Sequence, residues 1–234
     1  MASQTKVICI PQTLLASSIG ALCQRYKTAR LRALKEDPQA FSSTYDKESK
    51  FEDKTWAERL QNPQAKTFVA VRTEAIGGIE ISEIEQLSAN EWLGMVVLFG
   101  PRALPADGSE SRNPWKHFLA PSNLNQPSDP ATIADSEAAY VAFSMFVLAE
   151  ARRQGLGRKL VQASVEAARA EAMSMRATRA NIGLWAEAQN EAAQRLYEGC
   201  GFRFLPHDPV LDALEHPAVA MGKLVEFKSG GDSE

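Results

Sequence analysis

The sequence predicts an α/β fold of the α+β type, in which helices pack on a mixed sheet. Two patterns indicate this: β-rich runs alternate with segments of helical periodicity, and one strong strand near residue 147 runs through a glycine-bearing turn into an amphipathic helix. The chain has 234 residues, of which 44% are hydrophobic, enough for one domain with a sizeable core. We therefore expect residues 1–234 to form a single domain.

The first half of the chain predicts one strand, two helices and further strands. Apolar residues recur at three- and four-residue steps from 17 to 35, and Trp56 and Leu60 lie four apart within 53–62, so both segments are expected to be helices. Alternating, β-rich or apolar runs mark the strands. The strands expected here are 6–11, 67–72, 76–82 and 92–99.

Residues 101–137 differ in composition from the rest. Six of the twelve prolines lie between Pro101 and Pro130, among many Ser, Asn and Asp residues. A structureless loop of this length is uncommon within a compact domain. We interpret the segment as a Pro-rich insertion over one edge of the domain, with a short ordered turn at Trp115, His117 and Phe118.

The second half alternates strands and helices more regularly. Strands are expected at 138–148, 179–186, 202–205 and 218–225, and helices at 155–173 and 190–198. The last residues, 228–234, are Gly- and Ser-rich and are expected to be frayed.

Composition excludes several classes of protein. With 26 basic and 29 acidic residues the net charge is −3, so a nucleic-acid-binding surface is not indicated. Three widely spaced cysteines make no disulfide framework, and three histidines make no metal-binding pattern, so we expect no metal. Without an apolar run of membrane-spanning length or a signal peptide, we expect no membrane partner. A cytoplasmic location is expected, and a nuclear one is left open.

The turn before the helix at 155 has the features of a phosphate site. The first amides of a helix have no intrahelical partner, and their partial positive charge favours an anion. Gly155 and Gly157 would let a pyrophosphate approach the backbone. The alternative to a phosphate site is that the glycines are simply the small residues that packing requires at the start of this helix. Leu160 stands where a dinucleotide-binding fingerprint needs its third glycine, and no Walker lysine is present. Basic residues nearby are Arg152, Arg153, Arg158 and Lys159.

Residues 147–157, VLAEARRQGLG, resemble motif A of the GNAT superfamily of N-acetyltransferases. Arg152 and the two glycines match its Arg/Gln-x-x-Gly-x-Gly/Ala core, and Ala149 stands where many members have proline. Residues 190–202, NEAAQRLYEGCGF, resemble a second segment of the family in the expected order. The matching positions there are Asn190, Ala193, Leu196, Tyr197, Gly201 and Phe202. The resemblance covers residues 138–202.

This resemblance implies a GNAT-like fold with a mostly antiparallel central sheet, splayed strands and flanking helices, and acetyl-CoA as co-substrate. The strand ending at Val147 would diverge from the strand near 180–187, and the N–H of Val147 would face the thioester carbonyl. The cofactor-binding residues it implies are Phe146, Val147, Arg152, Arg153, Gln154, Gly155, Leu156, Gly157, Arg158 and Asn190. Asn190 would bond the cofactor arm or simply cap its helix.

The activity implied is transfer of an acetyl group to a primary amine by direct attack in a ternary complex. The acceptor would be a small-molecule amine or a peptide amine, and a homodimer is left open. Tyr197 is the candidate acid for the leaving thiolate, the alternative being a packed side chain. A different reading is a catalytically silent acyl-CoA-binding module that acts as a sensor or partner subunit.

The sequence leaves the general base open. Glu80, Glu83, Glu137 and Glu187 lie in or beside expected strands, but each is equally a surface charge, and Ser144 would order a water. A covalent route through Cys200 competes with a small residue filling a turn. The acidic residues within 42–52 hint at a cationic acceptor, and ordinary surface charge explains them as well.

Overall fold

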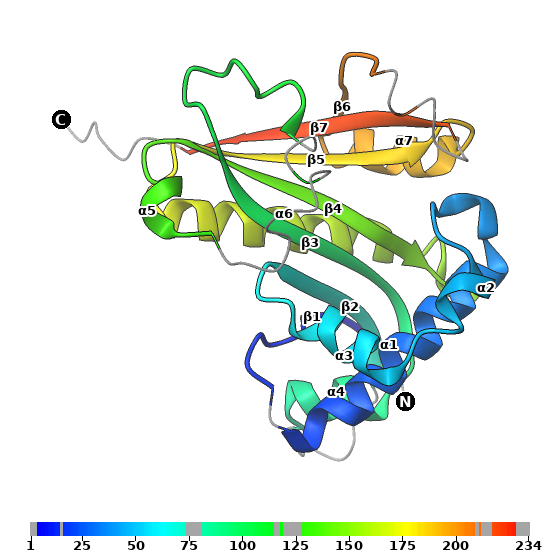
Figure 1. Ribbon diagram of the computed structural model, residues 1–234. Helices are drawn as coiled ribbons and strands as arrows, with labels where there is room; N and C mark the ends of the chain where they lie inside the picture. Colours follow the sequence, from blue (N-terminus) through cyan, green and yellow to red (C-terminus); the bar gives the residue numbers. More distant parts are fainter. Residues whose placement is uncertain are drawn as a thin grey trace.

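A computed structural model describes residues 4–14, 16–73, 81–114, 118, 128–208, 211 and 217–227. Within these residues, seven strands form one sheet in the order β1-β2-β3-β4-β5-β7-β6 (Figure 1). Every neighbouring pair is antiparallel except β4 and β5, which are parallel. The predicted mixed, mostly antiparallel sheet with flanking helices is confirmed.

The strands follow the predicted runs closely. They are β1 (Gln4–Cys9), β2 (Ala65–Thr73), β3 (Trp92–Leu104), β4 (Glu137–Val147), β5 (Arg179–Glu187), β6 (Arg203–Phe204) and β7 (Ala218–Glu226). The α-helices are α1 (Ala16–Glu36), α2 (Tyr45–Glu48), α3 (Asp53–Gln61), α4 (Glu83–Ala89), α5 (Pro130–Ile133), α6 (Leu156–Ser174) and α7 (Glu191–Gly199). Two short 3₁₀ turns are η1 (Pro38–Ala40) and η3 (Ala149–Ala151).

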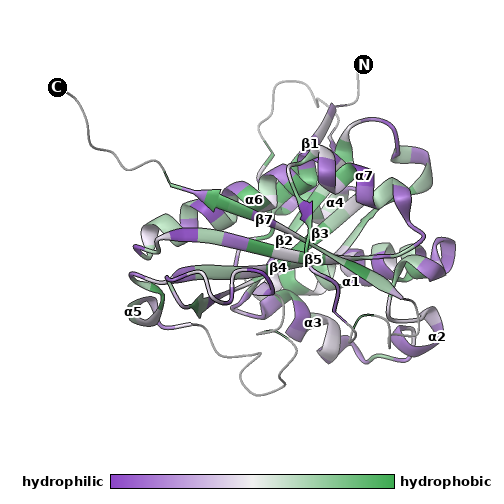
Figure 2. Cartoon of the chain, turned by 90° about the horizontal axis from the view of Figure 1, so that it is seen from above, coloured by the Kyte–Doolittle hydropathy of each residue, from purple (hydrophilic) through white to green (hydrophobic). Residues whose placement is uncertain are grey.

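Helices cover both faces of the sheet, and each face has its own apolar cluster. On one face α1 and α3 pack together through Tyr26 and Trp56, whose rings lie 5.6 Å apart. On the other face α6 crosses β2 to β5 and buries Leu160, with α7 beside it. Figure 2 shows the sheet from above, with α6 and α1 at different sides of it. The amphipathic patterns of these helices therefore have a direct structural cause.

The sheet splits between its two parallel strands. Pairing of β4 with β5 ends at Val141 and Gly183. Beyond this point β4 stays with β3 as far as Val147, while β5 continues along β7 to Glu187. The predicted divergence of the two strands is confirmed.

Two parts of the structure differ from the sequence interpretation. The expected strand at 76–82 falls mostly on residues outside those described, and its last two residues lead into α4, which was not predicted. Ser82 and Glu85 form a capping box there, a signal that the sequence did contain. Strand β3 extends five residues past the predicted end, through a register shift between Phe99 and Arg102, so the proposed insertion begins inside the sheet.

The predicted turn around Phe118 and the predicted frayed tail lie partly or wholly outside the residues that the structure describes. Phe118 is buried, and its ring packs 5.9 Å from that of Phe99. Trp115 and His117, as well as the tail 228–234, lie outside the described residues. Among the helices that the structure describes, none is long and apolar enough to span a membrane.

Candidate functional site

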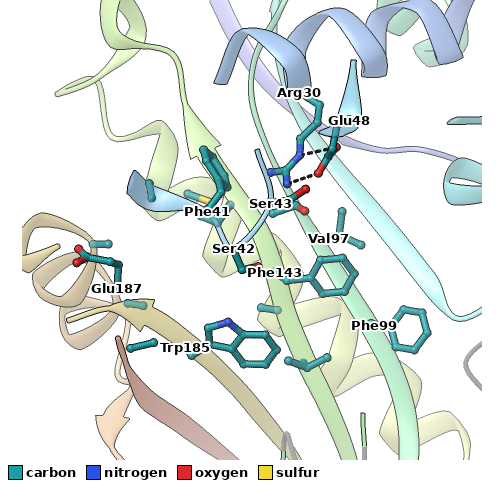
Figure 3. A pocket seen from close by; sticks show the side chains of 18 of the residues that line it. Arg30, Phe41, Ser42, Ser43, Glu48, Val97, Phe99, Phe143, Trp185 and Glu187 are labelled. Atoms are coloured by element: carbon teal, nitrogen blue, oxygen red, sulfur yellow. Dashed lines mark hydrogen bonds and ion pairs between the residues drawn. The ribbon is translucent and has the colours of Figure 1, made fainter. Parts of the chain in front are cut away.

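A cavity of about 590 Å³ lies where the two strands diverge. Its floor is the second half of β4, and its walls come from β3, β5 and α7. Residues 39–48 and parts of α1 and α3 complete it on the other side (Figure 3). The cavity thus lies between the part of β4 that directly precedes the segment resembling motif A and the N-terminal helices, which are far away in sequence.

The backbone of β4 is irregular along this cavity. Ser144 has a positive φ of 52°, and the register with β3 shifts between Met95 and Val97. Such a bulge ends regular pairing and redirects the strand. Gly94 allows β3 to approach closely, because a Cβ there would lie 2.6 Å from the carbonyl oxygen of Phe146.

The amide of Val147 faces the split. The N–H of Leu148 donates to the carbonyl of Leu93 at 2.8 Å, and the hydrogen-bonding direction alternates along an antiparallel strand. The N–H and C=O of Val147 therefore point away from β3, toward the space that β5 has left. The main chain of Phe146 faces β3 instead, and its ring packs against Phe41, with centroids 6.5 Å apart. This geometry gives Phe146 a supporting role.

Arg152 closes the end of β4. Its Nε donates to the carbonyl oxygen of Val147 at 2.9 Å, and its Nη2 forms an ion pair with Asp37. The side chain is about half exposed, so it joins the segment after α1 to the edge of the split. Part of its hydrogen-bonding capacity is therefore used within the protein.

The start of α6 presents unpaired amides to solvent. Gly155 is the N-cap, with a left-handed φ of 75°, and a Cβ there would meet nothing within 4 Å. The N–H of Lys159 bonds the carbonyl of Gly155 at 3.1 Å, so the amides of residues 156–158 precede the first intrahelical bond. A 19-residue helix with open space at this end has the features of an anion site. Arg153 and Gln154 are exposed beside it, and Leu156 is buried.

Gly157 and Arg158, which were expected to bind the phosphate, both contact α7. A Cβ on Gly157 would lie 3.0 Å from Cδ2 of Leu196, so a glycine here allows α6 to approach α7. Arg158 donates from Nη1 to the carbonyl of Gly199 at 2.9 Å, at the end of α7. The packing alternative for this turn therefore fits Gly157, and the side chain of Arg158 connects α6 to the end of α7.

Tyr197 lines the cavity from α7. It is 7% exposed and packs against Phe202, with ring centroids 5.9 Å apart. Burial, with a smaller contribution from Cys200, raises the pKa of its phenol. No protein hydrogen bond to its hydroxyl is found within the described residues, so the proton is retained and available. Asn190 also lines the cavity, and its Oδ1 caps α7 by accepting from the N–H of Ala193 at 3.0 Å.

Of the four glutamates considered as bases, Glu187 is the one found at the cavity. Glu137 is fully buried and pairs with Arg179. Glu83 lies on α4 and pairs with Lys6 at 2.7 Å. Glu80 lies outside the described residues. Ser144 and Trp185 also line the cavity.

A buried ionic cluster of Arg30, Glu48 and Arg59 was not predicted from the sequence. Glu48 accepts from Nε and Nη2 of Arg30 at 3.2 and 2.8 Å and from Nη1 of Arg59 at 2.8 Å. Burial by itself raises the pKa of Glu48, but the two guanidinium groups outweigh it and lower the pKa to about 2. Because Arg30 and Arg59 compensate its charge, Glu48 does not support the hypothesis of a cationic acceptor. Because it is buried, it is not an ordinary surface charge either. The missed signal is an arginine on the apolar face of α1, between Tyr26 and Ala33.

Comparison with known proteins places these features in a family. Residues 126–204 match the model of the acetyltransferase (GNAT) domain. Within residues 126–204 the chain therefore carries a GNAT acetyltransferase domain. This matched region contains the diverging strands, the start of α6 and Tyr197. No protein of curated function matches the sequence significantly.

Solved structures share the fold of this GNAT chain at low sequence identity. Arabidopsis thaliana NAA60 in complex with a bisubstrate analogue is 15% identical, covers 94% of this chain and 100% of its own, and superposes with a TM-score of 0.53. The same protein in complex with acetyl-CoA gives a TM-score of 0.52, at 15% identity over 94% of this chain and 98% of its own. Spermidine N-acetyltransferase from Vibrio cholerae, in complex with CoA and spermine, is 12% identical over 95% and 96%, with a TM-score of 0.49. At such identities the match shows the GNAT fold alone.

Proposed function

We propose that this chain is an N-acetyltransferase that transfers an acetyl group from acetyl-CoA to a primary amine by direct attack in a ternary complex. The observation that carries the proposal is the cavity between the diverging strands, which β4 lines as far as Met145, shortly before the turn that leads to the unpaired amides at the start of α6. A phosphate-bearing arm held at these amides would reach along the free edge of β4. One cavity would then hold both substrates.

The diphosphate of the co-substrate would bind at the main-chain amides that follow Arg153, where Gly155 leaves open space. Arg153 and Gln154 flank this position as exposed side chains. Arg152 would contribute less than its place in the motif suggests, because it already bonds Asp37 and Val147. Asn190 also lines the cavity. Its Oδ1 caps α7, so the residue would contact the arm while it keeps this hydrogen bond.

The proposed chemistry assigns one task to each group. The amine nitrogen attacks the thioester carbonyl carbon, whose oxygen gains negative charge beside the N–H of Val147. The carbon–sulfur bond breaks, the leaving thiolate takes the proton of Tyr197, and the proton that the attacking nitrogen then loses restores the phenol. Before the attack, the substrate ammonium loses a proton through water toward Glu187, a carboxylate that lines this cavity and forms no ion pair with the described residues.

The acceptor in this proposal is a small-molecule amine or a peptide amine. Its entry would be bounded by the N-terminal helices and by the segment 101–137, which we propose as an insertion into a single domain spanning residues 1–234. Acetyl transfer to an amine is the activity named for spermidine N-acetyltransferase. A homodimer remains a separate proposal.

Binding and turnover test this function in two stages. Acetyl-CoA should raise the thermal midpoint more than equal concentrations of ATP or NAD, because a ligand specific for the folded state stabilises it. Steady release of CoA with a panel of polyamines, amino acids and peptides should then identify active acceptors. Stabilisation without CoA release from any amine would favour the silent acyl-CoA-binding module, and preference for ATP or NAD would contradict both readings.

A further inference from the structure

We propose that the acceptor carries a carboxylate in addition to its amine, joined to it by an apolar body, and that Arg30 binds this carboxylate. The inference rests on the proposed function, because it concerns the acceptor half of the same cavity. It depends on one unsatisfied donor, on the charge of the cavity lining and on the character of the walls between Arg30 and β4.

The donor is the third nitrogen of the Arg30 guanidinium. Arg30 is 5% exposed and lines the cavity. Its Nε and Nη2 are used by Glu48, but its buried Nη1 has no hydrogen-bond partner among the described residues. Figure 3 shows this nitrogen on the side of the guanidinium that faces away from Glu48. A buried charged donor without a partner is costly, so the site is poised for an acceptor oxygen.

The charges around Arg30 favour an anion over a neutral group. Arg30 and Arg59 share the single carboxylate of Glu48, and Lys47 adds a third basic side chain to the cavity lining. Glu187, the other acidic residue in this lining, lies across the view of Figure 3 from Arg30. The two arginines therefore carry one positive charge more than Glu48 compensates, and Lys47 adds a second positive charge to the lining.

The walls between the two ends are apolar and aromatic. Phe143 points into the cavity and is 37% exposed, unusual for a large apolar side chain in the middle of a sheet. Exposed apolar surface inside a cavity favours a ligand with an apolar body. The other aromatic rings of the lining are Tyr26, Phe41, Phe51, Phe99, Phe118, Trp185 and Tyr197.

A row of contacts links Arg30 to the expected reaction centre. The guanidinium carbon lies 4.5 Å from the centroid of the Phe41 ring, which in turn packs 6.5 Å from that of Phe146, one residue before Val147. Arg30 is thus separated from the end of β4 by one aromatic layer. An acceptor whose amine lies at Val147 would reach Arg30 with a carboxylate at its other end.

Matched acceptors test the carboxylate directly. We would compare kcat/KM for benzylamine, 4-(aminomethyl)benzamide and 4-(aminomethyl)benzoate, in which the ring separates the carboxylate from the amine. Phenethylamine and phenylalanine are the control pair, because the carboxylate of phenylalanine is attached next to its amine. A charge-assisted hydrogen bond to Arg30 predicts that the carboxylate raises kcat/KM about 10-fold or more in the benzylamine set and not in the control pair. Equal or better use of the carboxylate-free amines in the benzylamine set, or an equal gain in the control pair, would overturn the inference and leave the proposed function standing.

Arg30→Lys then tests the residue. Lysine keeps the positive charge beside Glu48 but lacks the third nitrogen, so the preference for carboxylate should fall about 10-fold, with little change in the KM for acetyl-CoA. Arg32→Lys is the matched control, since it makes the same change on α1 at an exposed residue outside the cavity lining. An unchanged preference in Arg30→Lys, or an equal loss in Arg32→Lys, would contradict the role of Arg30.

A binding measurement separates this inference from the failure of catalysis. 4-Methylbenzoate has the carboxylate and the ring but no amine, and it should bind the wild-type protein with CoA present, by calorimetry, more tightly than 4-methylbenzamide. This holds even if no amine is acetylated and if Arg30→Lys does not fold. Equal affinity for the acid and the amide would overturn the inference, whereas absence of CoA binding would contradict the proposed function.

Discussion

The two sides of the proposed substrate site are built in different ways. The side formed by the end of β4 and the start of α6 consists mainly of main-chain groups, the amide of Val147 and those of residues 156–158. The opposite side consists of side chains, with Arg30, Glu48 and Arg59 brought together from three helices. One side therefore depends on backbone conformation and the other on buried charge.

This difference predicts different consequences of substitution. Changes at the main-chain side should affect binding of the co-substrate with every acceptor. Changes at the side-chain side should affect stability and the choice of acceptor, and leave the affinity for acetyl-CoA nearly unchanged. Substitutions on the two sides, in order of decreasing effect, test this difference.

The largest effect is expected from Gly155→Asp. The variant places a carboxylate where the diphosphate would bind and forces a non-glycine residue to a φ of 75°, so affinity for acetyl-CoA should fall more than about 100-fold. Calorimetric titration measures this loss. Gly20→Asp is the control, because Gly20 lies in α1 and also has nothing within 4 Å of its missing Cβ. Retained affinity in Gly155→Asp would place the diphosphate elsewhere.

Glu48→Gln should destabilise the fold without affecting the affinity for acetyl-CoA. The arginines lower the pKa of Glu48 from its usual value near 4.5 to about 2, which corresponds to about 3 kcal/mol of stability at neutral pH. Since the folded-state pKa is the lower one, this contribution is present above about pH 5 and is lost as the pH falls toward 2. Urea unfolding of both proteins between pH 7 and pH 2 measures the difference. A difference that does not shrink over this range would rule out the charge of Glu48 as its source.

Tyr197→Phe should lower kcat about 10- to 100-fold while the affinity for acetyl-CoA stays nearly constant. The ring is retained, so its packing against Phe202 should persist. Because burial raises the pKa of the phenol, the wild-type rate should also show no loss from Tyr197 ionisation below pH 10. Steady-state kinetics over pH 6–10 give both readouts. An unchanged kcat in the variant would remove Tyr197 from the acid role.

Glu187→Gln should have the smallest kinetic effect, about 10-fold on kcat, since its proposed role is carried through water. The loss in kcat should be greatest at low pH, where the acceptor amine is mostly protonated. It should decrease as the pH approaches the pKa of the amine. A pH series of kcat with a single acceptor measures this dependence. A rate equal to that of the wild type at pH 7 would show that proton removal does not need Glu187.

The sequence predicted the locally determined parts of the molecule well. Strand β4, the turn at Gly155 and helix α6 follow one another within 38 residues, from Glu137 to Ser174, and both motif segments lie in the matched region. The packing of Gly157 against Leu196 escaped prediction, because it depends on how two helices meet. Helix α4 was missed although its capping box was present in the sequence.

The ionic cluster could not be predicted from local pattern. Arg30, Glu48 and Arg59 are 11 to 29 residues apart, and each resembles an ordinary surface charge in its own segment. Their burial becomes apparent only once α1, α2 and α3 are packed. The same holds for the proposed role of Glu187, because its position at the cavity is a property of the folded sheet.

A crystal structure of the protein with coenzyme A tests the central claim most directly. The account predicts that the diphosphate lies against the amides of residues 156–158 and that the pantetheine arm runs along the free edge of β4, with its sulfur near the N–H of Val147. A diphosphate bound away from Gly155, or an arm that does not enter between β4 and β5, would contradict it.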